Sequence, residues 1–581
     1  MTTIKPIVKK VNDTIHGLNE FQELLVDSSQ KERDIILQFP TVYIYNWKDS
    51  DMYDVYIGES NNIIQRTKEH FDKASIEDNW QYRLVNSKDA NLYVIGHEHF
   101  NKSMTMDIEN RLMHYMMSVD RVRKIHNMRS NPQRRYFPDG EMDSIFQMIW
   151  RKLRKDNKDL FPLESKIKDS AVYKASPLHK LTSAQENIKN SILQRVFEVL
   201  NDTDEHQVIF VEGEAGTGKT VLNSSTFYEI FVSAENAGLE TLKCCMMVNH
   251  DEQITVYQQI AQKLGLTDKY GQVVCKPTSF INRTRKEEPI DIAFIDEAHL
   301  LLTQGKQSYK GKNQLKDIIE RAKVTVVMFD ENQILTTEQY WESEILEYYR
   351  NISKNQNNYF ELKEQLRMQA SAEVINWIDN FTKNRKVGKI PSRCGEYVIR
   401  VFGTPEELER ALKEKAFDDK HKLSRMIATY DWPYEEKKAK EHIEKYCVMI
   451  GEWYKPWNRE LNKELDGKSK RKNKTLSWAE QPQTIDEIGS TFTIQGFDLN
   501  YAGVILGPSV KYRNGEIVFD PAKSCHTKAV RNRTLSDGTK QKFGEILIQH
   551  QVRVLMTRGV EGLYIYACDD QLRKALLDSA K

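Results

Sequence analysis

Apolar positions near the start of the chain follow a helical spacing and then change to a strand-like one. From residue 41, two β-rich runs at 42–45 and 55–58 flank the polar turn 48–51, which predicts a hairpin. Beyond it we expect a helix at 63–71, a strand at 92–95 and a helix at 106–118. The pattern predicts a helical extension at 1–40 and a compact α+β domain at 41–145. The helical spacing of the extension runs through Phe21, Leu24, Leu25, Ile35 and Ile36.

Beyond residue 180, short apolar strands alternate with helical stretches, which is typical of a parallel sheet covered by helices on both faces. The charged, irregular stretch 146–180 is expected to be a linker or a bridging helix, and the polar segment 455–483 an exposed loop. We therefore predict an α/β chain with two parallel-sheet domains, 181–345 and 346–581. Their strands are expected at 208–212, 244–248, 292–295 and 324–329, then from Tyr359 onward at 426–429, 503–506, 552–555 and 563–567.

Composition adds little for or against a polyanionic partner. The 85 Lys and Arg residues balance 84 Asp and Glu residues, so evidence for nucleic-acid binding must come from individual sites. Seven cysteines without CxxC spacing indicate reduced thiols instead of a disulfide framework. The start of the chain lacks the apolar core of a signal peptide, and no apolar run approaches the roughly 20 residues that span a bilayer. We expect a cytoplasmic protein without a membrane partner.

Phosphate chemistry is indicated by the residues that follow the first parallel strand. They read Gly213-Glu214-Ala215-Gly216-Thr217-Gly218-Lys219-Thr220, a Walker A loop between a strand and a helix. Glycines at 213, 216 and 218 let backbone N–H groups close around the phosphates of ATP, and the helix N-terminus adds its dipole. We expect Lys219 to reach the β- and γ-phosphates and Thr220 to bind Mg²⁺.

A pair of carboxylates completes the predicted nucleotide site. Asp296 and Glu297 end the apolar run 292–295, about 75 residues after the Walker A loop, as a Walker B pair does. We expect Asp296 to hold Mg²⁺ through water and Glu297 to orient and deprotonate the attacking water. ATP hydrolysis is therefore the best supported activity.

Further motifs make residues 181–581 resemble the superfamily-one helicases, and among them the Schlafen-related motor domain. Leu181-Thr182-Ser183-Ala184-Gln185 looks like the Q-motif, in which Gln185 would read the adenine edge. Asp330 and Gln333 keep the spacing of the motif that senses the γ-phosphate, although Phe329 replaces its usual glycine. The resemblance implies two RecA-like domains with ATP bound between them.

The later motifs of this family carry arginines and strand contacts. Leu362-Lys363-Glu364-Gln365-Leu366-Arg367 resembles the motif that brings an arginine into the nucleotide cleft from the second domain. Val554-Leu555-Met556-Thr557-Arg558-Gly559 matches the last helicase motif, which makes Arg558 an expected arginine finger. The run 490–498 looks like the motif that contacts the nucleic-acid backbone. The resemblance implies strand contacts from Thr493, His250 and Tyr257.

The N-terminal hairpin carries a second resemblance. Tyr43-Ile44-Tyr45 and, ten residues later, Tyr56-Ile57-Gly58 resemble the signature of GIY-YIG nucleases, with Tyr43 at the usual glycine. Arg66 and His70 lie four residues apart, on one face of the next helix. Glu109 fits the metal-binding glutamate of that family, and Asn127 or Asn131 fits its late asparagine. The resemblance covers about residues 41–131 and implies a small α+β nuclease domain.

In such a domain the residues have complementary roles. Tyr45, assisted by Tyr56 or His70, would help to deprotonate water. Arg66 would neutralise the charge that develops on the phosphodiester, and one Mg²⁺ on Glu109 would stabilise the leaving oxygen. The resemblance therefore implies a metal-dependent endonuclease.

Together, the two resemblances imply an ATP-dependent nucleic-acid motor, a helicase or translocase, coupled to an endonuclease. DNA is the favoured substrate because both families mostly act on DNA, and a role in bacterial phage defence or DNA processing is expected. Two alternatives remain open. The protein is an ATP-gated clamp or sensor that does not unwind, since little sequence separates the motifs of each motor half, or it is an RNA-directed enzyme, since relatives of the motor domain act on tRNA.

Overall fold

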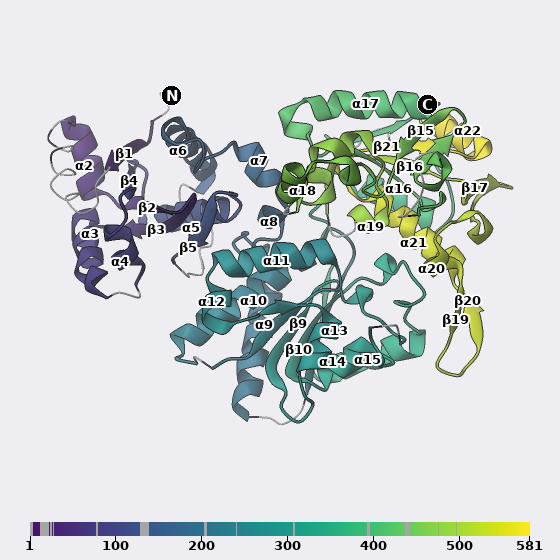
Figure 1. Cartoon of the computed structure of the whole chain (residues 1–581), viewed down its shortest axis with the longest axis horizontal. Coiled ribbons are helices and arrows are strands. Elements are labelled where there is room, and N and C mark those ends of the chain that lie inside the picture. The colour runs from purple at the N-terminus through teal and green to yellow at the C-terminus, as the bar shows by residue number, and fades with distance from the viewer. Residues whose placement is uncertain are drawn as a thin grey trace. The chain divides into compact units, whose positions relative to one another are not determined.

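The computed structural model of the chain divides into two compact units (Figure 1). The first contains Met1–Lys180, Ser224–Leu242 and Val256–Val274. The second contains Leu181–Asn223, Lys243–Thr255 and Cys275–Lys581. The structure describes residues 4–11, 23, 26, 28–76, 79–127, 139–202, 206–239, 241–305, 308–391, 395–435, 442–474, 476–494 and 497–581.

A five-stranded sheet in the order β1-β4-β2-β3-β5 lies at the centre of the first unit. The predicted hairpin is confirmed, because β2 and β3 pair antiparallel from Thr41↔Ser60 to Asp49↔Met52. Ser50 closes the turn with a φ of 60°. The first seven residues of β2 are mostly aromatic or β-branched, and all seven are buried, as suits a strand covered on both faces. The strands are β1 Ile7–Val11, β2 Thr41–Asp49, β3 Met52–Ser60, β4 Asn91–Gly96 and β5 Val122–Ile125.

The prediction of helix throughout 1–40 is wrong at its start. Ile7–Val11 is the edge strand β1, paired antiparallel with β4, whereas helix forms at α2, Gln30–Gln38. The two ends of β1 are buried and its lysines are half-buried, so the apolar alternation that marks a strand is missing from the sequence. Phe21, Leu24 and Leu25 lie outside the described residues.

The stretch 146–180 is not a linker. Helix α6, Met142–Asp156, buries Ile145, Phe146, Ile149, Trp150 and Leu153, a continuous apolar stripe at helical spacing. The indole of Trp150 donates to the carbonyl of Pro162 at 2.8 Å, which fixes the following turn. The charged residues that suggested a linker lie mostly on the other face of this helix. The remaining helices of residues 1–180 are α3 Ile63–Asp72, α4 Trp80–Val85, α5 Lys102–Met117, α7 Glu164–Asp169 and α8 Ala171–Lys174.

The first lobe of the second unit is built on a six-stranded sheet in the order β11-β6-β10-β9-β7-β8. Neighbouring strands from β11 to β7 run parallel, as predicted from the alternation of strands and helices. Strand β10 is buried along almost its whole length, and β6 is buried from Val208 to Val211. The strands are β6 Gln207–Gly213, β7 Cys244–Met247, β8 Val274–Cys275, β9 Ile290–Ile295, β10 Ala322–Phe329 and β11 Tyr359–Leu362.

This lobe extends beyond the predicted boundary at residue 345. Strand β11 pairs parallel with β6, from Tyr359↔Phe210 to Leu362↔Gly213, so it belongs to the first sheet and not to the second. A short apolar strand has the same local pattern in either sheet, and its partner lies about 150 residues away in the chain. The helices whose sequence falls in this part are α9 Ser183–Asp202, α10 Lys219–Asn236, α11 Asp251–Lys263, α12 Leu266–Tyr270, α13 Pro277–Arg283, α14 Gln314–Ile319 and α15 Ser343–Asn355.

The second lobe is built on a four-stranded parallel sheet in the order β12-β21-β16-β13. The strand predicted at 552–555 is wrong, because these residues lie within helix α21. A short run of Val and Leu fits a buried helix as well as a strand, and here nearly the whole helix is buried. The elements are β12 Val398–Val401, β13 Arg425–Ala428, β16 Leu499–Leu506, β21 Gly559–Ala567, α16 Ala372–Thr382, α17 Pro405–Phe417, α19 Thr491–Ile494, α20 Thr527–Val530, α21 Gly544–Met556 and α22 Asp570–Ser579.

The segment 455–483 is folded instead of forming an exposed loop. Trp457 and Trp478 are fully buried, and most residues of the short helix α18 between them are exposed. The segment begins in a hairpin and ends in two 3-10 turns, η8 Trp478–Glu480 and η9 Pro482–Asp486. The hairpin strands and other short elements of this lobe are β14 Cys447–Ile450, β15 Trp453–Pro456, α18 Gly467–Asn473, β17 Val510–Arg513, β18 Glu516–Phe519, β19 Asn532–Thr534 and β20 Lys540–Lys542.

The carboxyl ends of three neighbouring strands carry the predicted nucleotide motifs. The Walker A loop follows β6, Asp296 follows β9 and Asp330 follows β10, and these strands are adjacent in the sheet. Parallel strands place such residues along one edge, which is where α/β proteins bind ligands. Within the described residues, no helix combines the length and the apolar character that a bilayer span requires.

Candidate functional site

The Walker A loop adopts a conformation that requires glycine. Gly216 and Gly218 have φ angles of 86° and 79°, in the left-handed region. A Cβ on Gly216 would overlap the amide of Gln365, and one on Gly218 would overlap the amide of Gln185. Gln185 donates to the carbonyls of Thr217 and Gly218, each at 3.4 Å. The structure therefore brings Gln185 onto the phosphate loop itself.

Lys219 lies inside this loop. Its ammonium donates to the carbonyls of Gly213 at 2.6 Å and Glu214 at 2.9 Å, and it lies 3.5 Å from the carboxylate of Asp330. The side chain is only 6% exposed, so the charge is held at a fixed point. Phosphate oxygens can replace these carbonyl acceptors. Thr220, the next residue, is half-buried at the start of α10.

Two buried carboxylates lie at the end of β9. Asp296 is 1% exposed and Glu297 is 6% exposed. Glu297 has a φ of 49°, a left-handed conformation that non-glycine residues adopt mainly where the surroundings enforce it. Burial opposes its ionisation, but His299, Lys219 and Arg558 outweigh burial and lower its pKa. Glu297 is therefore ionised at neutral pH and able to accept a proton.

A line of polar contacts joins the two lobes through the predicted γ-phosphate sensor. The amide of Gln333 donates to Asp330 at 2.8 Å and accepts from Arg558 at 2.8 Å. Arg558 is fully buried, and burial together with the nearby Arg367 lowers its pKa to about 9. The guanidinium remains charged at neutral pH. Gln333 thus connects Arg558 to Asp330, whose carboxylate in turn lies 3.5 Å from the ammonium of Lys219.

Arg367 contacts the Walker A loop through its backbone. Its backbone N–H donates to the carbonyl of Gly216 at 3.2 Å, and its guanidinium pairs with Asp498 at 2.6 Å. The neighbouring Gln365 donates to the carbonyl of Ala215 at 2.6 Å. The structure thus brings the backbone of Arg367 onto the Walker A loop, whereas Arg558 is connected to Lys219 only through Gln333 and Asp330.

Sequence reasoning missed a second ionic contact on this loop. Glu214 accepts from Arg553 at 2.6 Å and from Lys383 at 2.9 Å. Asp379 contacts the same two cations, at 3.0 Å and 3.3 Å. Arg553 is 4% exposed. Its position one and a half helical turns before Arg558 was the available signal, but Glu214 occupies a loop position where many residue types fit.

The residues present fit a nucleoside triphosphate with a divalent cation. A cavity of about 390 Å³ opens between the ends of β6, β10 and β11; Gly213, Glu214 and Asp330 are in its lining, whereas Lys219, Thr220 and Asp296 are not. Among the described residues, no three acidic, histidine or cysteine side chains gather as metal ligands. Mg²⁺ needs few protein ligands, because it keeps several waters and binds phosphate oxygens. One hydroxyl from Thr220 and one carboxylate from Asp296 match that chemistry.

A separate polar cavity of about 270 Å³ lies in the first unit. Tyr43 lies at its base, where it accepts from Arg66 at 3.3 Å and lies 2.9 Å from Nε2 of His70. Burial and the Arg66 charge lower the pKa of His70 to about 4, so its ring is uncharged at neutral pH and can accept a hydrogen bond from Tyr43. The cavity is lined by Tyr43, Tyr56, Gly58, Glu59, Ser60, Asn61, Arg66, Lys102 and Glu109.

The expected role of Tyr45 needs correction. Tyr45 is fully buried, donates to Thr67 at 3.3 Å and does not line the cavity. Its pKa is raised by burial. Tyr43, which stands at the usual glycine, faces the cavity in its place, and Gly58 is required because a Cβ there would overlap the Tyr43 ring. Tyr56 also lines the cavity, stacked on Trp80 at 4.2 Å.

The other predicted residues of this cluster divide into two groups. Glu109 on α5 and Arg66 on α3 line the cavity. Lys102, which the sequence analysis did not single out, also lines it and pairs with Glu59 at 2.5 Å. Asn127 instead ties β5 to β3, donating to the carbonyl of Ile57 at 2.6 Å. Asn131 lies outside the described residues.

The predicted strand contacts are mostly buried. Thr493 is 3% exposed and bonds the backbone of Ser490, and Tyr257 is 4% exposed. His250 is half-buried. Phe492, which the sequence did not single out, is 39% exposed on α19, where its ring also contacts Tyr430 and His526 edge to face. Part of the ring is therefore accessible for stacking on a base.

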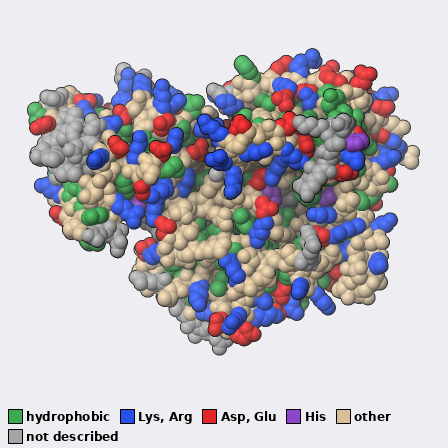
Figure 2. Space-filling view, viewed as in Figure 1, with side chains coloured by type: hydrophobic (Ala, Val, Ile, Leu, Met, Phe, Trp, Pro, Cys, Tyr) green, Lys and Arg blue, Asp and Glu red, His purple; other side chains and the backbone are tan. Residues whose placement is uncertain are grey.

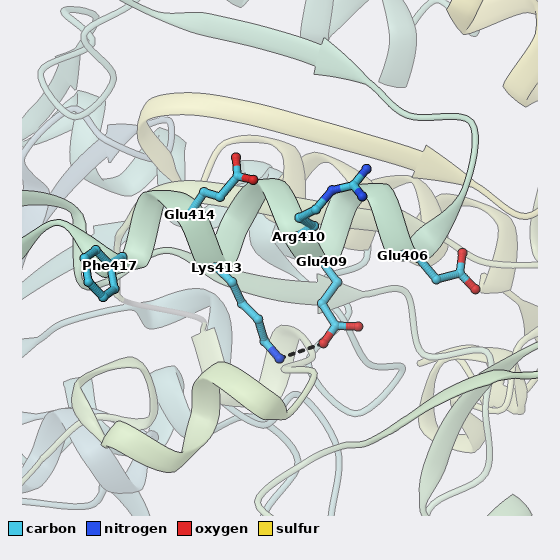
Figure 3. Close-up of a pocket in the computed structure, with 6 residues that line it drawn as sticks. All are labelled: Glu406, Glu409, Arg410, Lys413, Glu414 and Phe417. Atoms are coloured by element: carbon cyan, nitrogen blue, oxygen red, sulfur yellow. Dashed lines mark ion pairs between the residues drawn. The ribbon is translucent and has the colours of Figure 1, made fainter.

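A hollow of about 470 Å³ along α17 is a structural feature and not a site. Figure 3 shows Lys413 and Glu409 pointing toward one another on one side of the helix and Arg410 and Glu414 on the other. Glu409 pairs with Lys413 at 2.8 Å and Lys455 at 2.6 Å. These contacts outweigh burial and lower the pKa of Glu409 to about 2. The charges here neutralise one another.

Comparison with known proteins identifies the second unit. The family model described as Schlafen group 3, DNA/RNA helicase domain, matches residues 206–569. An uncharacterized protein of Saccharomyces cerevisiae, YPL245W, is 32% identical over 441 residues, covering 69% of this chain and 91% of that protein. A DEAD box protein of Methanococcus jannaschii is 12% identical, with a TM-score of 0.25 over 69% of this chain and 94% of that one, too weak a likeness to indicate a shared fold. The match over more than half of the chain supports a helicase-like ATPase, and the chain belongs to the family of the Schlafen group 3 DNA/RNA helicase domain.

Proposed function

We propose that this protein is an ATP-dependent nucleic-acid motor in which the second lobe responds to a nucleotide bound at Lys219. The observation that carries the proposal is the unbroken polar line from Lys219 through Asp330 and Gln333 to Arg558. This series of contacting side chains runs from the first lobe to the second, past the position expected for the γ-phosphate of ATP. Closure of the lobes can therefore depend on that phosphate.

The side chains suit hydrolysis at this point. Glu297, ionised and held in a strained conformation, accepts the proton of the attacking water. Arg558 and Arg367 neutralise negative charge on the transferring phosphoryl group. Mg²⁺ held by Thr220 and Asp296 would further neutralise the phosphate oxygens. The buried guanidinium of Arg558 needs little rearrangement, because Gln333 already orients it.

The N-terminal cavity supports the finer proposal of a metal-dependent endonuclease. Arg66 and Lys102 offer two cations to a phosphodiester, and Glu109 offers a carboxylate to Mg²⁺ in the same cavity. Tyr43 and Tyr56 present phenol oxygens there, and His70 lies 2.9 Å from the Tyr43 hydroxyl, where it orients that group. The cavity therefore combines the groups that phosphodiester hydrolysis requires.

The favoured substrate is DNA, and RNA is the alternative. ATP turnover of the purified protein, measured with single-stranded DNA and RNA of the same sequence, tests the motor and its preference. We expect DNA to stimulate turnover more than RNA, and no stimulation by either would contradict the motor. A role in phage defence or DNA processing stays a prediction.

A nucleic-acid clamp without unwinding is the second candidate. The described part of the insert between β13 and β16 folds back onto Trp457 and Trp478 and adds no separate domain that would split a duplex. Strand displacement on a forked duplex separates the two, because a clamp hydrolyses ATP without releasing the displaced strand.

A further inference from the structure

Helix α18 concentrates positive charge that the nucleotide site does not use. Between residues 455 and 474 the sequence has eight basic residues and three acidic ones. Five of the basic residues lie in or beside α18, and all five are exposed: Lys468, Lys470, Arg471, Lys472 and Lys474. Within the part of the chain that the structure describes, no carboxylate lies within ion-pair distance of Lys468 or Arg471.

This arrangement is unfavourable for the helix alone. Lys468 lies three residues before Arg471 and four before Lys472, so like charges face each other along one side. Such pairs destabilise a helix unless an anion lies between them. An exposed surface that keeps this repulsion is suited to a polyanionic partner.

The helix is nevertheless rigidly attached. Asp466 caps its N-terminus by accepting from the backbone of Lys468 at 2.7 Å and Ser469 at 2.8 Å. At the other end Asn473 is 7% exposed and donates to Gln483 at 3.2 Å. The turns that follow are built on the buried Trp478. The basic side chains therefore project from a fixed support.

The same support carries the motif expected to contact the strand. The indole of Trp478 donates to Glu487 at 2.8 Å, and a Cβ on Gly489 would overlap its ring. Ser490 donates to Asn458 at 2.6 Å and precedes α19, which carries the exposed Phe492. Figure 2 shows Lys and Arg side chains gathered over the part of this face where Figure 1 draws α18.

We propose that α18 binds the sugar–phosphate backbone of the nucleic acid on which this protein acts, as a sequence-independent contact. The inference rests on the proposed function, because it concerns the strand that the motor holds. Exposed Lys and Arg side chains contact phosphates, displace counterions and bind less tightly as salt rises. A basic helix and a partly exposed aromatic ring, both held by the segment around the buried Trp478, match the combination that single-stranded nucleic acid requires.

The test is the double charge reversal Lys468→Glu and Arg471→Glu in the full chain. Affinity for fluorescein-labelled oligo(dT) and oligo(rU) of equal length is measured by anisotropy at several NaCl concentrations. We expect binding at least about tenfold weaker and a salt slope smaller by about one to two, since each lost phosphate contact on a single strand contributes about 0.7. The matched control, Lys540→Glu with Lys542→Glu, reverses two exposed lysines of β20 and should change affinity less than about twofold.

The outcomes separate this inference from the proposed function. Unchanged affinity in the α18 variant, with wild-type binding intact, overturns the inference alone. Wild-type protein that binds neither oligonucleotide overturns both. Loss of binding to polyglutamate with oligonucleotide binding retained assigns the helix to an acidic protein instead and also overturns the inference. Basal ATPase at the wild-type level shows that the variant is folded, and Lys468→Gln with Arg471→Gln gives a milder substitution for the same measurement.

Discussion

At the scale of single residues, the nucleotide site depends on charges held at fixed points. Lys219, Glu297 and Arg558 are all nearly or fully buried, and hydrogen bonds hold the side chains of Lys219 and Arg558 in place. The sequence predicted these three residues because their motifs have fixed spacing. It did not predict Glu214 or Arg553, since their pairing joins two positions separated by 339 residues.

Substitutions of the motif residues should separate binding from turnover. We expect Lys219→Ala or Glu297→Gln to abolish ATP turnover, because the first removes the phosphate cation and the second the proton acceptor. Arg558→Ala should leave ATP binding largely intact and lower kcat at least about 100-fold. Steady-state ATPase and nucleotide-binding titrations measure both quantities. A smaller loss in Arg558→Ala would make Arg367 the main arginine of the cleft.

The pairing of Glu214 with Arg553 should appear as energetic coupling. Charge-assisted hydrogen bonds contribute about 1.5–3 kcal/mol, so we expect Arg553→Gln and Glu214→Gln each to lower kcat/KM by roughly tenfold or more. A double-mutant cycle should give a coupling of about 0.5–3 kcal/mol, because both substitutions break one contact. Strictly additive effects would show that the two residues act separately. Lys581→Gln, an exposed C-terminal lysine, serves as the charge-matched control.

At the scale of elements, local pattern predicted those whose partners are close in sequence. The hairpin of β2 and β3 was correctly predicted because both strands and their turn lie within 20 residues. Strand β11 was assigned to the wrong sheet, since only the long-range partner β6 determines its place. The strand predicted at 552–555 was wrong because these residues belong to the buried part of α21, which lacks the exposed polar positions that would reveal a helical period.

The buried apolar side chains of α6 should contribute measurably to the free energy of unfolding. Trp150→Ala should lower the free energy of unfolding of the N-terminal domain by about 3–5 kcal/mol, since it removes a buried ring and the hydrogen bond to Pro162. Thermal melts of fragments ending at residue 145 or 180 check the same point. We expect the longer fragment to melt at the higher temperature, and equal melting would restore the linker assignment.

Helix α3 should make this domain sensitive to acid. The pKa of His70 is lowered to about 4 in the folded protein, below the value of about 6.5 in an unfolded chain. The unfolded state therefore binds more protons between these pH values, and stability falls as pH drops from about 6.5 to 4. Thermal melts across this range should show a weaker pH dependence in His70→Gln, which keeps a hydrogen-bond acceptor for Tyr43. An identical pH dependence would exclude His70 as a contributor.

At the scale of the whole molecule, the two proposed activities use separate residues. Glu109→Gln should stop Mg²⁺-dependent cutting of nucleic acid and leave ATP turnover unchanged, because Glu109 belongs to the first unit and the nucleotide motifs to the second. Cleavage and ATPase assays on the same preparation measure both. Continued cutting by the variant would remove Glu109 from the proposed metal site.

The passage from the first lobe to the second is very short, and this has a mechanical consequence. Leu362 is still paired with Gly213 in the first sheet, and Arg367, five residues later, already contacts Asp498 of the second lobe. The hinge and the segment that carries Arg367 are therefore the same few residues, and any rotation of the lobes must change the direction in which this guanidinium points. A flexible insertion after Lys363 would lengthen this connection, so that both lobes could still fold while ATP binding would no longer be coupled to movement of the second lobe.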